Sequence, residues 1–97
     1  ALKIKSTVGG SGNIVRIDDS SGDSSPFIID RSGRVGINTV TANNDLDVFG
    51  NIGIVGETRH YNTTFSNYAG FKASSTLTSN LIWTLPTTVD ISRIYFY

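Results

Sequence analysis

Very short apolar runs, each closed by glycine, asparagine or aspartate, dominate this sequence. Between Pro26 and Gly56 the chain reads PFIIDRSGRVGINTVTANNDLDVFGNIGIVG. Runs of three or four apolar or alternating residues suit strands, and no helical periodicity follows any of them. Gly and Asn supply the positive φ angles and local hydrogen bonds that tight turns need. The pattern predicts successive short β-strands joined by tight turns, a fibre-like repeat rather than an enzyme core.

The composition favours strands and offers little for a self-contained core. Val and Ile number 18, against five Leu and four Ala, and their branched Cβ atoms suit a pleated sheet. Gly, Ser, Thr and Asn make up 41 of the 97 residues. A chain this small, without cysteines for disulfides, buries a modest share of its surface alone. We therefore expect an all-β chain that gains stability by burying its strands against copies of itself.

Strands and turns are expected along the whole chain. The expected strands cover residues 2–8, 13–18, 27–30, 34–37, 46–49, 52–55, 71–77, 81–85 and 91–97, and the expected turns cover 9–12, 18–23, 32–33, 43–45 and 50–51. Residues 63–73 carry aromatics at a spacing that would fit a helical face. Because this stretch also contains Gly70, we favour an extended or irregular segment there.

The sequence predicts three consecutive segments along the chain. Residues 1–25 form an N-terminal β segment with a Gly/Ser/Asp-rich turn, residues 26–56 a repeat-like fibre element, and residues 57–97 a C-terminal β segment. We expect the chain to be a segment of a longer protein. The apolar stretch at residues 94–97 would need a cover, because an exposed hydrophobic sheet edge invites aggregation.

The charge pattern argues against nucleic-acid and membrane partners. Eight basic and eight acidic residues give a formal net charge of zero, and they are scattered instead of clustered. Nucleic-acid binding needs gathered Lys and Arg side chains that displace counterions. The apolar runs are far too short for a membrane-spanning helix.

The candidate catalytic and metal-binding residues have simpler explanations. His60 is the only histidine, with no nucleophile or carboxylate at a suggestive spacing, so a surface or interface position is expected. Residues 18, 19 and 23 are aspartates without the order of a calcium loop, which favours a solvated turn. Asp45 and Asp47 would share one strand face, and an outward polar face is preferred over a glycosidase pair. We expect no enzyme activity, no metal and no cofactor.

The central residues carry a resemblance to a known class of protein. The three stretches PFIID (26–30), GRVGINT (33–39) and LDVFGNI (46–52) resemble the β element of bacteriophage tail fibres, tail spikes and related trimeric virion appendages. The stretch from Phe71 to Pro86 is similar to segments that follow such elements. Asn38 stands where the family usually has glycine, and Ala42 stands about where a proline is usual.

The resemblance implies a fold, a location and partners. The fold would be an intertwined homotrimeric fibre, β-prism or β-helix-like, located in the virion and bound to other virion structural proteins. Its role would be a shaft or adaptor that links the particle to host recognition. In such a trimer each chain would give one apolar face to a common axis.

Specific residues are expected to build this trimer. The expected trimer interior consists of Val35, Ile37, Leu46, Val48, Ile52 and Ile54, and the expected turns contain Gly33, Gly36, Gly50 and Gly53.

The exposed aromatics leave an alternative open. Trp83, Tyr61 and Tyr68 could stack against sugar rings of a host-surface glycan, which would make the chain a carbohydrate-binding module at a fibre tip. Packing in a core or subunit interface is favoured, since Trp83 lies between Ile82 and Leu85 in an apolar run. An enzyme fragment such as a spike depolymerase ranks third, because no carboxylate cleft is visible.

Overall fold

The chain is built of short strands in two sheets. The computed structural model describes residues 2–3 and 12–89, and these contain six strands and no helix. The all-β expectation is therefore confirmed for this part of the chain. Contacts divide the chain into two compact units, residues 1–53 and residues 54–97. The strand expected at residues 91–97, and most of the one expected at 2–8, lie outside the described residues.

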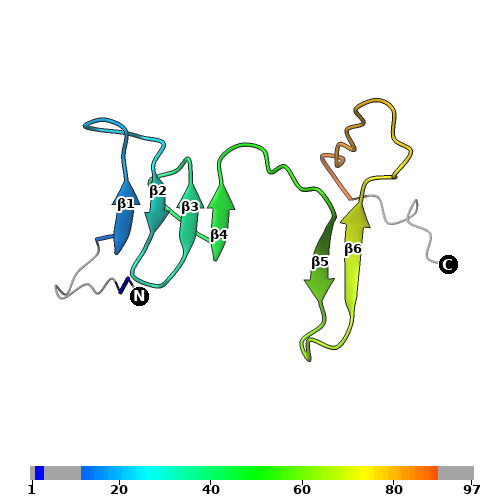
Figure 1. Cartoon of the computed structure of the whole chain (residues 1–97), viewed down its shortest axis with the longest axis horizontal. Helices are drawn as coiled ribbons and strands as arrows, with labels where there is room; N and C mark the ends of the chain where they lie inside the picture. The colour runs from blue at the N-terminus through cyan, green and yellow to red at the C-terminus, as the bar shows by residue number, and fades with distance from the viewer. Residues whose placement is uncertain (1, 4–11, 90–97) are drawn as a thin grey trace. The chain divides into compact units, whose positions relative to one another are not determined.

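The first unit holds a four-stranded sheet (Figure 1). Its strands are β1 (Val15–Ile17), β2 (Phe27–Ile29), β3 (Val35–Ile37) and β4 (Leu46–Val48), and they lie side by side in chain order. Strands β1, β2 and β3 are successively antiparallel, whereas β3 and β4 are parallel. The sheet therefore begins as a meander and ends with a crossover.

An aspartate and a glycine shape the turn between β2 and β3. The Asp30 carboxylate accepts hydrogen bonds from the backbone N–H groups of Ser32 and Arg34, both at 2.9 Å, and from Nε of Arg34 at 2.8 Å. These bonds, the Arg34 backbone bond first, hold the pKa of Asp30 below its usual value. Gly33 adopts φ +81°, which a residue with a Cβ rarely reaches.

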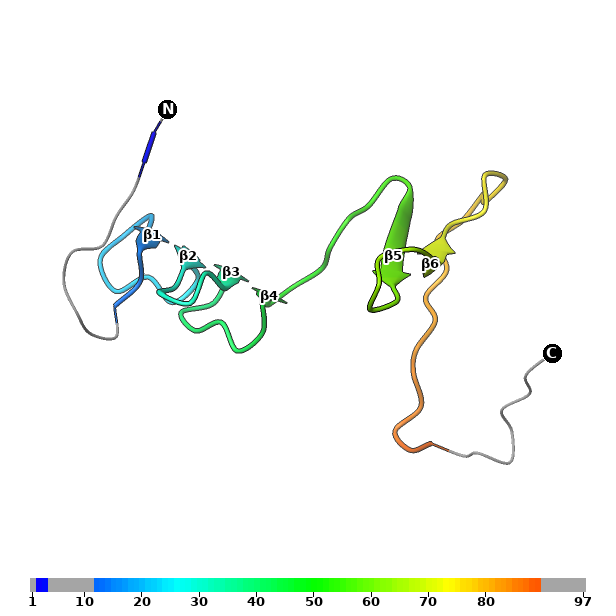
Figure 2. The same ribbon diagram turned by 90° about the horizontal axis from the view of Figure 1, so that it is seen from below.

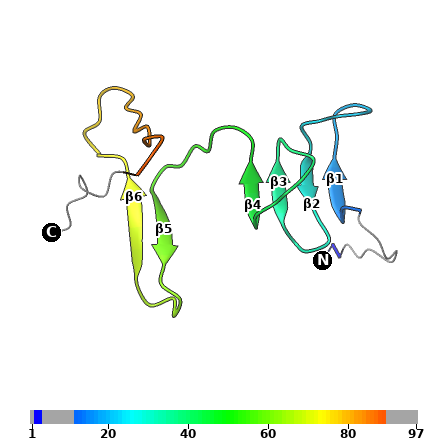
Figure 3. The same cartoon turned by 180° about the vertical axis from the view of Figure 1, so that it is seen from behind.

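The parallel connection from β3 to β4 is unusually short. Parallel neighbours usually need a crossover of about a dozen residues or more, whereas residues 38–45 make this one. Asn38 begins it at φ +65°, donates its backbone N–H to Pro26 O at 3.0 Å, and donates Nδ2 to Phe49 O at 2.6 Å. Asparagine tolerates this left-handed backbone better than most residues with a Cβ. The connection lies on one side of the sheet, as the views along the strands and from behind show (Figures 2 and 3).

The small core lies under this connection. Ile28 of β2 is 1% exposed and Ala42 of the connection is 3% exposed, and Pro26 is also buried. Gly36 stands opposite Ile28 in the register of β2 and β3. A Cβ on Gly36 would lie 2.8 Å from Cγ1 of Ile28 and 3.0 Å from Cγ2 of Thr39. The turn predicted for Gly36 is thus wrong: this glycine lies within β3 and makes room for Ile28.

The second unit contains a long hairpin, β5 (Glu57–Tyr61) and β6 (Tyr68–Lys72). Its loop is organised by Asn62, whose backbone N–H donates to Asn67 O at 2.9 Å and whose Oδ1 accepts from the Ser66 N–H at 3.0 Å. No described residue of this unit is buried, and only Glu57 and Thr58 are half-buried. A two-stranded hairpin of this kind is marginal in water without further packing.

Several sequence-based predictions need correction. Residues 52–55 and 81–85 are not strands, and residues 57–61, which form β5, were not predicted as one. The stretch 63–73 is a loop followed by the whole of β6, in line with the non-helical expectation. A division after residue 25 is wrong, because β1 pairs with β2 across it. The predicted boundary after residue 56 lies near the division between Gly53 and Ile54.

The Gly36→Ala substitution is expected to destabilise the four-stranded sheet by about 1–3 kcal/mol, because its methyl group overlaps Ile28 in a packed site. Urea unfolding of the full chain measures the change. Gly53→Ala is the matched control, since nothing lies within 4 Å of its Cβ position, and no loss is expected. Equal unfolding midpoints for the two variants would contradict the close packing.

Candidate functional site

One face of the four-stranded sheet carries apolar side chains alone. Residues in register on neighbouring strands share a face, and alternate residues point to opposite faces. The register therefore places two apolar rows on one face, which we call the apolar face: Val15, Ile29, Val35 and Leu46 in one row, and Ile17, Phe27, Ile37 and Val48 in the other. Eight branched or aromatic side chains thus stand together without a charge among them.

The apolar face is left open to solvent. Phe27 and Ile37 lie on the two central strands, flanked on both sides, and are still 37% and 41% exposed. Ile17 and Leu46, on the outer strands, reach 62% and 53%. Side chains of this size normally gain about 1.5–3 kcal/mol each from full burial. The face therefore has the chemistry of a core that lacks its second layer.

The opposite face holds the packed residues and the charges. It carries Arg16, Ile28, Gly36 and Asp47 across the four strands. Arg16 Nε lies 2.8 Å from Oδ1 of Asp18, and Arg16 Nη2 donates to Asp23 O at 2.7 Å. Charge and packing are thus kept on the covered side of the sheet.

Asp47 ties β4 to the end of the crossover. Its carboxylate accepts from the Asn44 side chain at 2.7 Å and from the backbone N–H of Asn43. These bonds, the Asn44 side chain first, lower the pKa of Asp47. The carboxylate is therefore half-buried and part of the loop structure, rather than on the outward polar face that was expected.

The structure places four of the six predicted interior residues together. Val35, Ile37, Leu46 and Val48 all lie on the apolar face. Ile52 and Ile54 lie outside the strands, 61% and 52% exposed. Their part in a trimer stays a prediction.

Of the four glycines predicted to lie in turns, Gly33 and Gly50 lie in a turn or bend. Gly33 lies in a turn with a left-handed backbone, and Gly50 lies in a bend after β4 at φ +154°. Gly53 lies in no turn, because residues 51–54 run without one, so that prediction is wrong.

Four members of the apolar face were not predicted. They are contributed by β1 and β2: Val15, Ile17, Phe27 and Ile29. The alternation of VRI at 15–17 was the available signal for β1. The run FII at 27–29 is apolar throughout, so periodicity alone cannot tell which side chain turns to the core and which to the open face.

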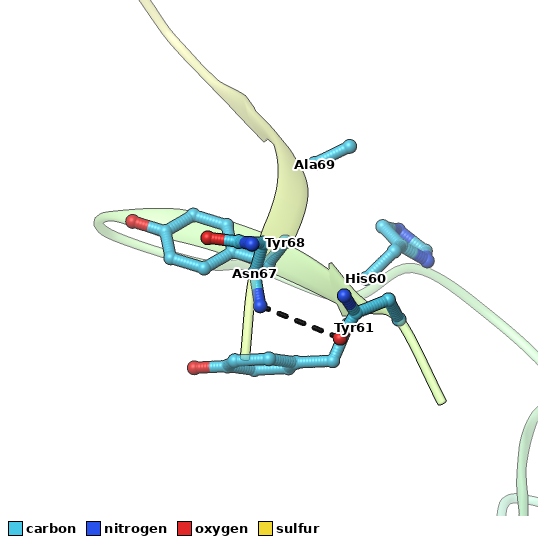
Figure 4. A pocket seen from close by; sticks show the side chains of 6 residues that line it. His60, Tyr61, Asn67, Tyr68 and Ala69 are labelled. Atoms are coloured by element: carbon cyan, nitrogen blue, oxygen red, sulfur yellow. Dashed lines mark hydrogen bonds between the residues drawn. The ribbon is translucent and has the colours of Figure 1, made fainter. Parts of the chain in front are cut away.

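A second exposed cluster lies at the end of the β5–β6 hairpin. The rings of Tyr61 and Phe65 are stacked with centroids 4.4 Å apart, and Tyr61 and Tyr68 are tilted at 5.4 Å. We call these three rings the hairpin ledge. Tyr61 and Tyr68 extend to the same side of the hairpin and His60 to the other (Figure 4). The residues around the two tyrosines border an open hollow of about 350 Å³.

Charged side chains contact the rings of the hairpin ledge and each other. The Arg59 guanidinium lies 4.5 Å from the centre of the Tyr68 ring, and its Nε donates to Oε1 of Glu57 at 2.6 Å. The bond from Arg59 is the main cause that lowers the pKa of Glu57. His60 makes an edge contact with Phe71 at 6.0 Å, which fits the expected surface or interface position. Trp83 lies outside the strands, is 77% exposed, and does not line the hollow.

Within residues 2–3 and 12–89, no three His, Cys, Asp or Glu side chains gather in a way that could hold a metal ion. Nor does this part of the chain contain a helix of the length and apolarity that crossing a bilayer requires. No protein-family model, curated protein or solved structure matches the chain. The apolar face and the hairpin ledge are therefore the features from which function can be argued.

Phe65 sits at φ +62°, an uncommon backbone for a bulky residue, which costs about 1–2 kcal/mol relative to glycine. We expect Phe65→Gly to be more stable than Phe65→Ala by about 1 kcal/mol, because both lose the ring and only alanine keeps the strain. Thermal unfolding of the two variants measures the difference. An alanine variant at least as stable as the glycine variant would mean that the loop relaxes and stores no strain.

Proposed function

We propose that the chain is a structural segment of a bacteriophage tail fibre or related virion appendage. In this proposal three copies form a β-rich shaft or adaptor that joins the particle to a host-recognition part. The chain acts mechanically, through a stiff and protease-resistant assembly, and carries out no catalysis.

The open apolar face is the observation that carries the proposal. Two rows of apolar side chains are half-buried or exposed, while the buried side chains beneath them are, among the described residues, little more than Ile28, Ala42 and Pro26. Such a chain needs a partner that buries its strands.

A copy of the same chain is the partner that fits. The apolar face carries no charge in its rows, so an apolar surface must meet it, and another copy presents that surface in the same shape. The formal net charge of zero means that copies do not repel one another at neutral pH. The number three comes from the resemblance of residues 26–52 to trimeric appendages. Ile52 and Ile54 belong to the proposed interior as exposed apolar side chains next to this element.

Val48→Asp is expected to abolish the trimer. An unpaired charge in a buried interface costs about 3–5 kcal/mol, which weakens association more than a hundredfold at each contact. Native mass spectrometry and sedimentation at micromolar concentration measure the oligomeric state.

Val55→Asp is the matched control for this substitution. Val55 is fully exposed and lies outside the apolar face, so its variant should remain trimeric. A stable folded monomer of the unaltered chain would refute the proposal. Trimers that survive Val48→Asp would show that the apolar face is not the interface.

The hairpin ledge favours a second candidate, a carbohydrate-binding module at a fibre tip. Stacked, exposed rings next to an open hollow and the amides of Asn62 and Asn67 offer a flat apolar surface with polar groups at its rim. Pyranose sugars present a matching apolar face and hydroxyl groups. Trp83 is left out of this site, because it does not line the hollow.

Binding to a glycan array tests the second candidate. Tyr61→Ala and Tyr68→Ala are each expected to weaken any glycan binding about tenfold, as the loss of a stacking ring does. Trp83→Ala should leave it unchanged. An array without hits would remove this candidate and leave the shaft proposal intact.

A further inference from the structure

The two outer strands of the four-stranded sheet are open edges. The strand order β1-β2-β3-β4 leaves one side of β1 and one side of β4 without a strand among the described residues (Figure 1). Open edges are usually protected by very short strands, by charged side chains such as lysine, by proline or by a bulge. Neither β1 (VRI) nor β4 (LDV) contains lysine or proline. Both strands are three residues long and each carries one charge, Arg16 on β1 and Asp47 on β4. These charges disfavour pairing between two like edges and leave pairing with the oppositely charged edge open.

We infer that copies join edge to edge, with β4 of one copy parallel to β1 of the next and Asp47 opposite the neighbouring copy's Arg16. This inference rests on the proposed homotrimer and states how its copies are connected. Strand direction permits it, because β1 and β4 point the same way within one sheet. Rotation about an axis along the strands keeps that direction, so a ring of copies pairs every β4 with a β1 in parallel.

The free backbone groups of the β4 edge are those of Leu46 and Val48. Val35 N–H donates to Asp45 O at 2.8 Å, and Phe49 N–H donates to Ile37 O at 3.0 Å. Successive residues of a strand direct their N–H and C=O to alternate sides. The odd-numbered residues of this stretch therefore bond to β3, and the groups of the two even-numbered residues point to the open side.

Arg16 presents the complementary groups on β1. The bonds from Asp30 N–H to Arg34 O and from Asn38 N–H to Pro26 O flank the pairing of Ile28 with β3. By alternation, Phe27 and Ile29 face β1, and Ile29 O accepts from the N–H of Ile14 at 2.8 Å just before that strand. Within β1, Val15 and Ile17 stand opposite Ile29 and Phe27, so the N–H and C=O of Arg16 between them point outward. In a parallel ladder, a residue whose N–H and C=O face the neighbouring strand does not bond to the residue directly opposite. It bonds to the two residues that flank that opposite residue. With Asp47 opposite, Arg16 would donate to Leu46 O and accept from Val48 N–H.

The same register continues the apolar rows from one copy into the next. Leu46 would stand beside the neighbouring copy's Val15, and Val48 beside its Ile17. These are the ends of the same two rows within a single sheet. The apolar face would thus run unbroken around the assembly, on its interior side. A slip by one residue would place a charge in each row.

The charges on the opposite face favour the pairing of β4 with β1 over the pairing of two β4 edges or two β1 edges. Asp47 and Arg16 have opposite charges, and both lie on the covered side of the sheet. Arg16 uses Nε and Nη2 within its own chain, which leaves Nη1 to donate. A two-fold pairing centred on either edge would put Asp47 against Asp47, or Arg16 against Arg16, and like charges directly opposite are destabilising.

A disulfide pair in this cysteine-free chain tests the register. Opposed residues on neighbouring strands lie about 4.8 Å apart, within the range of about 4.4–6.8 Å that a disulfide spans. The double variant Arg16→Cys/Asp47→Cys, oxidised as the assembled protein, should give covalent dimers and trimers on a non-reducing gel, with the trimer as the largest product. Either single variant should give none.

A second cysteine pair is the control for a change in loop structure. Asp47→Cys also removes the hydrogen bonds that Asp47 accepts from Asn43 and Asn44. Val15→Cys/Leu46→Cys tests the same register without changing a charge and should give the same products. If native mass spectrometry shows trimers but neither pair cross-links, the edge pairing is wrong and the homotrimer stands. Dimers from a single variant would also overturn it, since like edges would then meet. A monomer would overturn both the edge pairing and the proposed function.

Discussion

The approach of Ile28 to Gly36 is the contact on which the four-stranded sheet depends. The missing Cβ of Gly36 lets Ile28 lie under Thr39 and Ala42, and this small cluster is nearly all that the described chain buries. The short crossover passes close to that space, since Thr39 Cγ2 would lie 3.0 Å from a Cβ on Gly36. A parallel β4 follows from it, and with β4 comes the second half of the apolar face.

This arrangement separates the two faces of the sheet by chemistry. One face takes the crossover, the buried isoleucine and the charged side chains, and the other keeps eight apolar side chains in two rows. A sheet with one covered face is half of a layered core. The proposed trimer supplies the missing half from the same chain, through the apolar side chains. The proposed edge pairing connects the copies of that trimer through the backbone of β1 and β4.

Sequence reasoning worked where short-range chemistry decides the structure. The runs at 27–30, 34–37 and 46–49 contain β2, β3 and β4. It failed where a strand depends on its partner. Residues 57–61 (ETRHY) lack an apolar run, yet they form β5 because β6 pairs with them along their whole length. Residues 81–85 are strongly apolar, but no strand lies beside them among the described residues, so they form none.

The sequence by itself determined that this chain is made of short strands and tight turns, because β-branched residues and glycine or asparagine act through local sterics. Only the tertiary structure decided which side of each strand is covered. In FII at 27–29 the three side chains are equally apolar, and it is the crossover that makes Ile28 the core residue and turns Phe27 and Ile29 to the open face. Strand register and the path of the connection are long-range properties, set by hydrogen bonds between residues far apart in the chain.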